Sequence, residues 1–339
     1  MKIALVGPYP PPYGGISVHI QRMEALLAAH GHTPIVFKGL SVKNWLFAAR
    51  GSWFDFDVVH FHNIALRDRI LIGLLGLFGV KVILTIHGDS LKDQLENNRW
   101  VLKALLGFAM RQIRHIVVVK SEIRDSLLSL GVMPSRISVI NAYLPPLNNS
   151  ANIPKDISDF IDSHSPVLIG NGFGILPISE GSDLYGVELT MDLCRKLVKD
   201  YPKLGFLFFL AQIGDQRMYE RLRTKIRDNG LQEHYVFAIG QELFPALNKA
   251  TIFIRPSFRD GYSISIAEAI YLGVPTIASD VCERGAGAIL FRSGDLNSLY
   301  MKVREVLDHY DEVKMFVEAH QPDSSYERLL SVYEMVTKG

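Results

Sequence analysis

The stretch IFIRPSFRDGYSISIAEAIYLGVPTIASD, at residues 252–280, carries the strongest indication of the fold. An apolar strand that ends at Ile254 leads through a glycine-containing loop into a short helix. That helix closes at Gly273-Val274-Pro275, which is a typical helix stop, and a second apolar strand follows at once. A strand, a helix and a strand in such close succession predict two parallel neighbours in one sheet.

The same alternation of strands and helices continues along most of the chain. In the first half we expect strands at 3–6, 35–37, 58–61, 82–86, 116–119 and 137–140, with helices at 16–30, 65–78, 91–110 and 121–130. In the second half we expect strands at 167–169, 205–210, 235–238, 252–254, 276–278 and 288–291, with helices at 184–199, 216–229, 264–272 and 326–337. Short apolar strands between helices predict an α/β protein whose parallel sheets are covered on both faces.

A tract rich in proline and asparagine, at residues 144–150, interrupts this alternation and indicates a linker. The chain has 339 residues, enough for about two domains of ~150 residues each. We therefore expect two Rossmann-like, doubly wound domains, at residues 1–147 and 148–322, facing a cleft. Ligands of such sheets bind beyond the carboxyl ends of the strands.

The composition excludes several classes of protein. Hydrophobic residues make up 48% of the chain and charged residues 21%, which is too apolar for intrinsic disorder. The formal net charge of +1 gives no support to a nucleic-acid partner. Cys194 and Cys282 are too few for a disulfide framework and lack zinc-type spacing, so we expect a reducing, cytoplasmic location. We also expect no signal peptide and no membrane span.

Charge is distributed unevenly between the two halves. Residues 1–147 hold 16 Lys and Arg against 9 Asp and Glu, a net charge of +7. Within residues 99–120 basic side chains interleave with apolar ones, namely Arg99, Lys103, Arg111, Arg114 and Lys120 with Trp100, Leu105, Phe108 and Met110. Two interpretations stay open, a solvated helix face over the core or an interfacial patch that touches anionic lipid.

A pair of glycines, Gly14 and Gly15, follows the first expected strand and precedes the first expected helix. Glycine lets the backbone approach a ligand closely, and the start of a helix offers unpaired N–H groups to an anion. A turn that needs positive φ would explain the same pair without a ligand. The spacing differs from the dinucleotide fingerprint, so we do not expect a nicotinamide cofactor.

Histidines gather at two strand ends of the first half. His87 follows the strand that ends at Ile86, and His60 and His62 flank Phe61 at the end of another strand. A histidine there can bond a reacting sugar or acceptor, although such residues are commonly structural. Three histidines also raise the question of a metal ion. No carboxylate lies at ligand spacing with them, so we expect no metal.

Two acidic residues, Asp260 and Glu268, lie eight positions apart around the loop after Ile254. Asp260 falls in the loop and Glu268 about one turn into the helix, so we expect both to face one ligand. Gly261, Ser263 and Ile264 supply N–H groups at the helix start. Carboxylates suit the hydroxyls of a sugar and the helix start suits phosphate, which together indicate a nucleotide-sugar site.

The sequence here resembles the retaining GT-B-fold glycosyltransferases of family four. That family has two acidic residues with seven residues between them, then a helix of small residues and a Gly-x-Pro turn. Asp260 and Glu268, followed by Ala269 and Gly273-Val274-Pro275, match it, with Asp260 where the family usually has Glu. The Gly14-Gly15 loop and the strand end 85–88 match as well, and the resemblance covers nearly the whole chain.

The resemblance implies a role for individual residues. Glu268 would hold the ribose hydroxyls, and Asp260 and His87 would be catalytic residues beside the transferred sugar. The donor would contact Gly261, Tyr262, Ser263, Ile264 and Ser265, and Gly14 and Gly15 would approach its pyrophosphate. The final helix, at about 323–339, would cross back onto the first domain. The family usually needs no metal ion.

One departure from the family pattern concerns the charge of the leaving pyrophosphate. The family usually supplies an Arg and a Lys here, but no Arg or Lys occurs between Lys155 and Arg195. Either Arg255 or Arg259, with helix-start amides and Asn171, takes over this task, or the chain is a weak or inactive binding relative.

The function implied is that of a retaining hexosyltransferase without a cofactor. It would move a sugar from a nucleotide-sugar, expected to be a UDP-sugar, to a saccharide or lipid-linked acceptor in cell-envelope polysaccharide or glycolipid synthesis. Its location would be the cytoplasm, including the cytoplasmic face of the membrane. Two alternatives remain, a non-catalytic nucleotide-sugar-binding subunit and a GT-B-type nucleotide-sugar epimerase.

Overall fold

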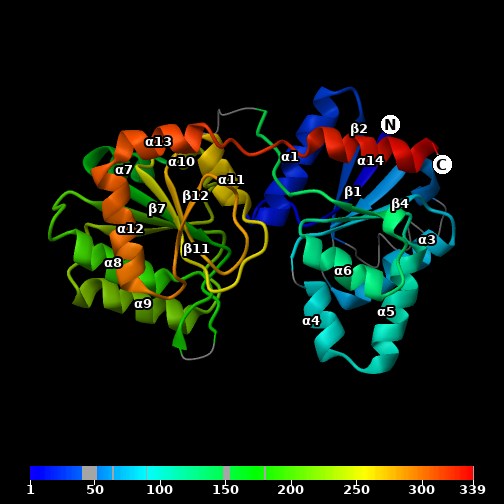
Figure 1. Cartoon of the computed structure of the whole chain (residues 1–339), viewed down its shortest axis with the longest axis horizontal. Coiled ribbons are helices and arrows are strands. Elements are labelled where there is room, and N and C mark those ends of the chain that lie inside the picture. Colours follow the sequence, from blue (N-terminus) through cyan, green and yellow to red (C-terminus); the bar gives the residue numbers. More distant parts are fainter. Residues whose placement is uncertain (40–51, 63–64, 89, 148–152, 179–180, 339) are drawn as a thin grey trace. The chain divides into compact units, whose positions relative to one another are not determined.

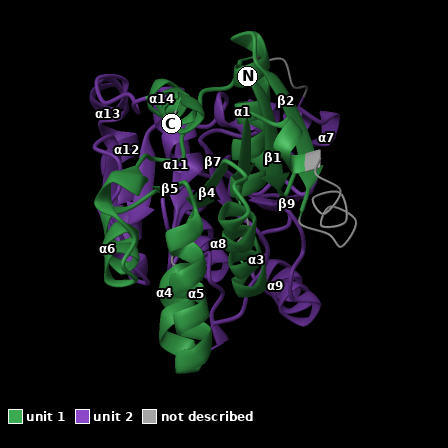
Figure 2. Cartoon of the chain, turned by 90° about the vertical axis from the view of Figure 1, so that its right-hand side faces the viewer, with its two compact units in different colours: residues 1–10, 16–147, 324–339 green, residues 11–15, 148–323 purple. Residues whose placement is uncertain are grey.

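The computed structural model describes residues 1–39, 52–62, 65–88, 90–147, 153–178 and 181–338. The chain forms two compact units (Figure 2). Unit 1 comprises residues 1–10, 16–147 and 324–339, and unit 2 comprises residues 11–15 and 148–323. Of the expected linker at 144–150, residues 148–150 lie outside the described part of the chain.

Unit 1, which carries both chain ends in Figure 1, is built around a parallel sheet. Its six strands follow the order β2-β1-β3-β4-β5-β6. Its strands are β1 (Lys2–Gly7), β2 (Thr33–Lys38), β3 (Val58–Phe61), β4 (Val82–Ile86), β5 (His115–Val118) and β6 (Ile137–Val139). Its helices are α1 (Gly15–Ala29), α3 (Leu66–Leu77), α4 (Ser90–Asn97), α5 (Trp100–Gln112), α6 (Ser121–Ser129) and α14 (Tyr326–Lys338). Single 3-10 turns lie at Ser52–Asp55 and Pro134–Arg136.

The C-terminal helix α14 is part of unit 1. Its apolar residues, including Leu329, Val332 and Val336, pack in one core with α1 and the strands of the first sheet. The Tyr333 hydroxyl lies 2.6 Å from His60 Nδ1 and donates to Met23 Sδ at 3.0 Å. The Tyr333 hydroxyl and the His60 ring are both buried, and their hydrogen bonds offset the cost of removing these polar groups from water.

Unit 2 has a second six-stranded parallel sheet, in the order β12-β11-β10-β7-β8-β9. Its strands are β7 (Val167–Gly172), β8 (Gly205–Leu210), β9 (Tyr235–Ile239), β10 (Ile252–Arg255), β11 (Thr276–Ser279) and β12 (Ala288–Phe291). Its helices are α7 (Lys155–Ser163), α8 (Val187–Leu197), α9 (Gln216–Asp228), α10 (Phe244–Leu247), α11 (Ile264–Tyr271), α12 (Leu296–Asp308) and α13 (Tyr310–Glu318).

Two separate cores cover the two faces of the second sheet. Helices α8, α9 and α12 contribute to one core, and α7, α10, α11 and α13 contribute to the other. Strand β8 divides its side chains between them, because successive residues of a strand point to opposite faces: Phe206 and Phe208 enter the first core and Leu207 and Phe209 the second. The predicted class, α/β with parallel sheets covered on both faces, is confirmed.

The prediction of one long helix at 91–110 is wrong, because the structure has two helices there. α4 ends at Asn97 and α5 begins at Trp100, with Arg99 in an extended conformation. The side-chain amides of Asn97 and Asn98 donate to the carbonyls of Asp93 and Gln94, at 3.0 and 2.9 Å. These bonds satisfy the last carbonyls of α4 from side chains, which is how asparagine competes with a continuing helix.

The helix expected to start at Leu184 starts instead at Val187. The buried Asp183 carboxylate accepts hydrogen bonds from the backbone N–H groups of Tyr185, Val187 and Glu188. Gly186 lies between them with a φ of 67°, a conformation that glycine adopts without strain. Helix α7, at Lys155–Ser163, was not among the predicted helices, and two further helices, α12 and α13, lie between the last predicted strand and the last predicted helix.

Among the described residues no helix combines the length and the apolar character that crossing a bilayer requires. Helices α3 and α5 nevertheless approach each other closely in unit 1. A Cβ placed on Gly73 of α3 would come within 2.5 Å of the Cα, Cβ and carbonyl oxygen of Ala109 on α5. The helix pair therefore depends on the absence of a side chain at Gly73.

We expect Gly73→Ala to destabilise the protein although alanine favours a helix by about 1 kcal/mol. The new methyl group would contact the backbone of Ala109, which can move only together with the rest of α5. Overpacking of this kind costs about 1–3 kcal/mol. The midpoint of urea unfolding measures the change. Gly107→Ala on α5 is the matched control, because the nearest atom to its Cβ would be the side-chain end of Leu130, at 3.3 Å, and the nearest backbone atom would be 3.8 Å away. Equal midpoints for the two variants would contradict the packing argument.

Candidate functional site

Three neighbouring strands of unit 2 end beside one another at the carboxyl edge of the sheet. They are β11, β10 and β7, in that order, and their last residues include Ser279, Arg255 and Asn171. The loop after β10 contains Asp260 and leads into α11. Because parallel strands bring their carboxyl ends to one edge, residues that are far apart in sequence meet here.

Asp260 is the centre of this arrangement. Its Oδ2 accepts from Arg255 Nε at 2.9 Å, Arg284 Nη1 at 2.9 Å and Ser257 Oγ at 3.1 Å. Its Oδ1 accepts from Arg255 Nη2 at 3.1 Å and from the backbone N–H of Gly261 at 3.1 Å. The exposed fraction of the side chain is 10% for Asp260, 9% for Arg255 and 2% for Arg284. Asp260 therefore holds its own loop against two strand ends.

The two arginines also fix the protonation state of Asp260. Burial alone would raise the pKa of the carboxyl, but the charge and hydrogen bonds of Arg255, followed by those of Arg284, outweigh it and lower the pKa to about 2. Asp260 therefore stays ionised throughout the neutral range. A carboxylate in this state has no proton to donate as a general acid and is too weakly basic to accept one.

The polar network extends from Asp260 to the strand end at Asn171. Arg255 Nη1 donates to the Asn171 carbonyl at 2.8 Å and to its Oδ1 at 3.0 Å. Ser265 Oγ donates to the same Oδ1 at 3.0 Å, and Ser263 Oγ lies 3.0 Å from Ser265 Oγ. The Arg255 guanidinium also stacks over the Tyr185 ring, 4.8 Å from its centroid. The network joins β7, β10 and the start of α11.

Helix α11 carries the second acidic residue. It begins at Ile264, after Ser263 in an extended conformation, and Glu268 lies in its second turn with 4% of its surface exposed. Gly261, Tyr262 and Ser263 are half-buried in the loop before it, and Arg259 is exposed. The structure thus brings Asn171, Arg255, Asp260, Ser263 and Ser265 into one hydrogen-bonded network, and it keeps Glu268 on the adjoining helix.

Sequence reasoning missed Arg284, together with Ser257 and Ser279. Arg284 donates to Asp260, to the Ser279 carbonyl at 3.1 Å, and to the hydroxyls of Ser257 and Ser279. It lies 24 positions after Asp260, in the segment between β11 and β12, so no local spacing links the two. Only the parallel pairing of β10 with β11 brings that segment to the edge.

The glycine pair at the first loop lies in the short segment, residues 11–15, that groups with unit 2. Gly15 is the first residue of α1 and does not have the positive φ that the turn interpretation requires of it. That interpretation is therefore wrong for Gly15. Gly14 donates its backbone N–H to the Pro12 carbonyl at 3.1 Å.

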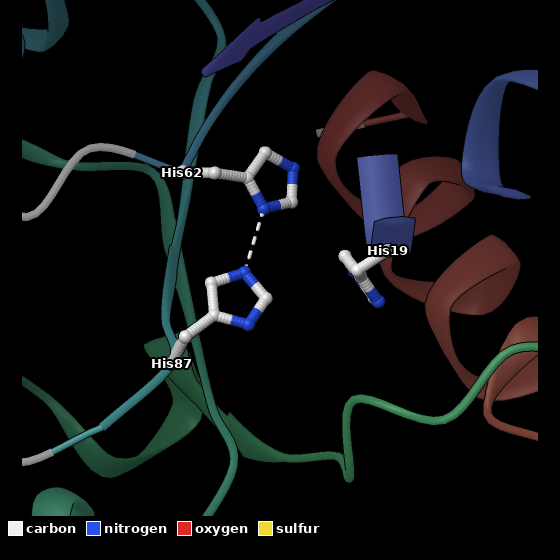
Figure 3. Close-up of side chains that lie close together, drawn as sticks. All are labelled: His19, His62 and His87. Atoms are coloured by element: carbon white, nitrogen blue, oxygen red, sulfur yellow. Dashed lines mark hydrogen bonds between the residues drawn. The ribbon is translucent and has the colours of Figure 1, made fainter. Parts of the chain in front are cut away.

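Unit 1 contains a cluster of three histidines, namely His19 of α1, His62 after β3 and His87 after β4 (Figure 3). His62 Nδ1 and His87 Nε2 are 2.9 Å apart, and the His19 ring lies 5.4 and 4.9 Å from the rings of His62 and His87. Sequence reasoning grouped His60 with His62 and His87 and missed His19. His60 is instead bonded to Tyr333 and, through Nε2, to the Thr85 hydroxyl at 2.7 Å.

Burial lowers the pKa of these imidazoles. The pKa of His19 falls to about 4, with a hydrogen bond to the Ala142 carbonyl acting in the opposite direction. For His60, His62 and His87 the pKa lies well below the usual value, because burial and then the neighbouring histidines disfavour the charged form. All four rings are therefore neutral at pH 7.

Comparison with known proteins gives matches in both halves of the chain. Residues 183–309 match the family model described as glycosyl transferases group 1, and residues 38–142 match the model described as glycosyltransferase family 4. The chain is 24% identical over 323 residues to 2-deoxystreptamine N-acetyl-D-glucosaminyltransferase of Niallia circulans, covering 86% of this chain and 78% of that protein.

Solved structures share the fold over the full chain. Anabaena HepE in complex with UDP-glucose is similar with a TM-score of 0.69 and 15% identity, covering 100% of this chain and 97% of that one. WaaG, a glycosyltransferase involved in lipopolysaccharide biosynthesis, is similar with a TM-score of 0.67 and 15% identity, covering 100% of both chains. The matches in both halves of the sequence and the fold of the two units support a group 1 glycosyltransferase with the GT-B fold.

Proposed function

We propose that the protein is a retaining hexosyltransferase that takes its sugar from a UDP-sugar. The acceptor is a saccharide or a lipid-linked saccharide, and the pathway is the synthesis of a cell-envelope polysaccharide or glycolipid. The observation that carries this proposal is the buried network of Asp260, Arg255 and Arg284 at the sheet edge beside α11. It supports a rigid, polar platform at the position where α/β sheets bind their ligands.

Names of similar proteins support the choice of donor and pathway. HepE was solved with UDP-glucose, and WaaG is involved in lipopolysaccharide biosynthesis. The Niallia circulans enzyme is named for the transfer of an N-acetylglucosaminyl group. These names favour a UDP-linked hexose as the donor. They point to different acceptors, so they do not select one for this protein.

In this proposal Glu268 binds the ribose hydroxyls and Asp260 acts as a positioning residue. All the contacts of Asp260 described above are to the protein, so its role near the transferred sugar is to hold the Gly261–Ile264 backbone and the side chains of Ser263 and Ser265 in place. His87 lies beside the sugar at the proposed reaction centre, where its neutral imidazole forms a hydrogen bond with the sugar.

In the proposed reaction, protein side chains take little part in proton transfer. The anomeric carbon–oxygen bond breaks with oxocarbenium character, and the leaving phosphate oxygen takes the proton of the acceptor hydroxyl. We propose no covalent intermediate, since Asp260 is held by two arginines and its carboxylate is a poor nucleophile in that state. The configuration at the anomeric carbon is retained.

Few basic side chains are in a position to neutralise the leaving pyrophosphate. Arg255 is already bonded to Asp260 and Asn171, and no Arg or Lys occurs between Lys155 and Arg195. The pyrophosphate would rely on backbone N–H groups at the start of α11, with Arg259 and the glycines at 14–15. This shortage of cations favours the second candidate, a nucleotide-sugar-binding subunit without turnover.

A panel of nucleotide-sugars with saccharide acceptors tests the function directly. We expect one UDP-sugar to give UDP and a glycosylated acceptor, detected by mass spectrometry, with an anomeric proton coupling in NMR that matches the donor. Inversion would overturn the retaining mechanism. Stabilisation by UDP without turnover would identify the binding subunit, and a second sugar nucleotide formed without acceptor would identify an epimerase.

Glu268→Gln tests the ribose assignment, because it removes the charge and keeps the size of the side chain. A hydrogen bond to a charged group contributes about 1.5–3 kcal/mol, so we expect UDP to bind about 10- to 100-fold more weakly in calorimetry. Glu305→Gln on α12 is the control, since Glu305 pairs with Lys302 on an exposed helix face. Unchanged UDP affinity in a folded Glu268→Gln protein would remove Glu268 from the site.

We further propose that unit 1 touches anionic membranes through the start of α5. Trp100 is 78% exposed, and Val101, Leu105 and Phe108 are exposed as well. At 3.6 residues per turn these four side chains fall within an arc of about 140° on one face of the helix. Arg99 and Arg114 are exposed near its two ends, and Lys103 is half-buried. An apolar face among basic side chains suits the interface of an anionic bilayer.

Met110 does not contribute to this surface, because it is buried in the core, and Arg111 donates to the Leu130 carbonyl at 2.8 Å. We therefore test the surface by changing Arg99, Lys103 and Arg114 together to Gln. A basic residue near an anionic surface contributes about 1 kcal/mol, so we expect vesicle binding to weaken on the order of 100-fold at low salt. The control changes Arg217, Arg223 and Arg227 of α9 to Gln. Equal, salt-insensitive partitioning of both variants would refute the membrane proposal.

A further inference from the structure

We propose that His19, His62 and His87 of unit 1 form a binding site for one first-row transition-metal ion, of which Zn²⁺ is the expected occupant. The site goes beyond glycosyl transfer, although it shares His87 with the proposed reaction centre, and metal binding is measured without a sugar. Its three ligands come from separate elements, namely α1 and the segments that follow β3 and β4. Figure 3 shows the three rings gathered at this point.

The first argument is the convergence of the nitrogen atoms. One ring nitrogen from each histidine lies within 4.8 Å of the other two, and the facing nitrogens of His62 and His87 are already 2.9 Å apart. Zinc binds imidazole nitrogen at about 2.0–2.1 Å, which places two nitrogens of a tetrahedral site roughly 3.3 Å apart. The observed spacings, 2.9 Å for one pair and at most 4.8 Å for the others, lie on both sides of this value.

The second argument is the orientation of His19. Its Nδ1 lies 2.8 Å from the Ala142 carbonyl oxygen, which can only accept, so Nδ1 carries the proton. A neutral ring protonated at Nδ1 presents a lone pair at Nε2. That atom is buried and has no hydrogen-bond partner among the described residues. Metal-ligating histidines commonly donate their other N–H to a backbone carbonyl in this way, which fixes the tautomer and the ring.

The third argument concerns His62 and His87. Their facing nitrogens share a single proton, and the second nitrogen of His62, Nε2, is buried without a hydrogen-bond partner in the described chain. A metal ion would replace the shared proton, which moves to the far nitrogen of the same ring, so both imidazoles stay neutral.

The three imidazole ligands determine which kind of metal ion the site would prefer. Three imidazoles suit zinc, cobalt, nickel and copper, whereas magnesium and calcium prefer oxygen ligands. His60 lies next to the cluster but is excluded from it, because Tyr333 and Thr85 occupy both of its nitrogens. His87 is half-buried, whereas His19 and His62 are buried, so the proposed ion would enter from the side of His87.

The full-length protein, freed of metal by a chelator, tests the proposal without any sugar donor. Titration with Co²⁺ reports the site through the strong visible absorption of a four-coordinate complex, and competition with Zn²⁺ gives the zinc affinity. We expect one equivalent of metal and a rise in the midpoint of thermal unfolding, because the ion binds only the folded site. We expect His19→Gln and His87→Gln each to weaken binding at least about tenfold.

His115→Gln is the matched control. His115 is another buried histidine of unit 1, and its Nε2 is bonded to Ser138 Oγ at 2.8 Å, outside the cluster. It should keep the stoichiometry and the spectrum. His87 is partly exposed, so His87→Gln tests the site even if His19→Gln fails to fold. The proposal is overturned if the parent protein binds no stoichiometric metal, which would leave the buried nitrogens to water, or if both cluster variants bind as the parent does.

Discussion

The ion pairs that Asp260 makes with Arg255 and Arg284 hold the carboxyl edge of the second sheet together. A carboxylate buried this deeply is tolerated only when its charge and its lone pairs are all matched, and here two guanidinium groups, a hydroxyl and a backbone N–H match them. The partners come from a strand end, from the loop itself and from the segment after β11. The conformation of the loop is therefore tied to two strands at once.

This constraint separates the tasks of the two acidic residues. Asp260 is bonded to protein groups and stays ionised, whereas Glu268 is buried on α11, the helix that follows the loop. An arginine that serves the loop cannot at the same time provide its full charge to a pyrophosphate. The two arginines that make the loop rigid are therefore the ones whose charge Asp260 already matches.

The strands were predictable because each is a short run of apolar residues. Most helices were predictable because their apolar residues recur at helical spacing. The break between α4 and α5 was not, since it depends on which carbonyls the amides of Asn97 and Asn98 reach. The start of α8 depends in the same way on the side chain of Asp183. His19 escaped notice for another reason, because it lies inside a helix and nothing in its local sequence relates it to two strand ends.

The sequence alone determined that the chain forms parallel α/β sheets, and it singled out the loop and helix around Asp260 and Glu268 as the place of interest. Local patterns suffice for this, because strand and helix periods and helix stops act over a few residues. The tertiary structure decided which groups meet there and in unit 1. Arg284 reaches Asp260, and His19 reaches His62 and His87, only because parallel strands and the helices packed on them bring distant segments to one edge.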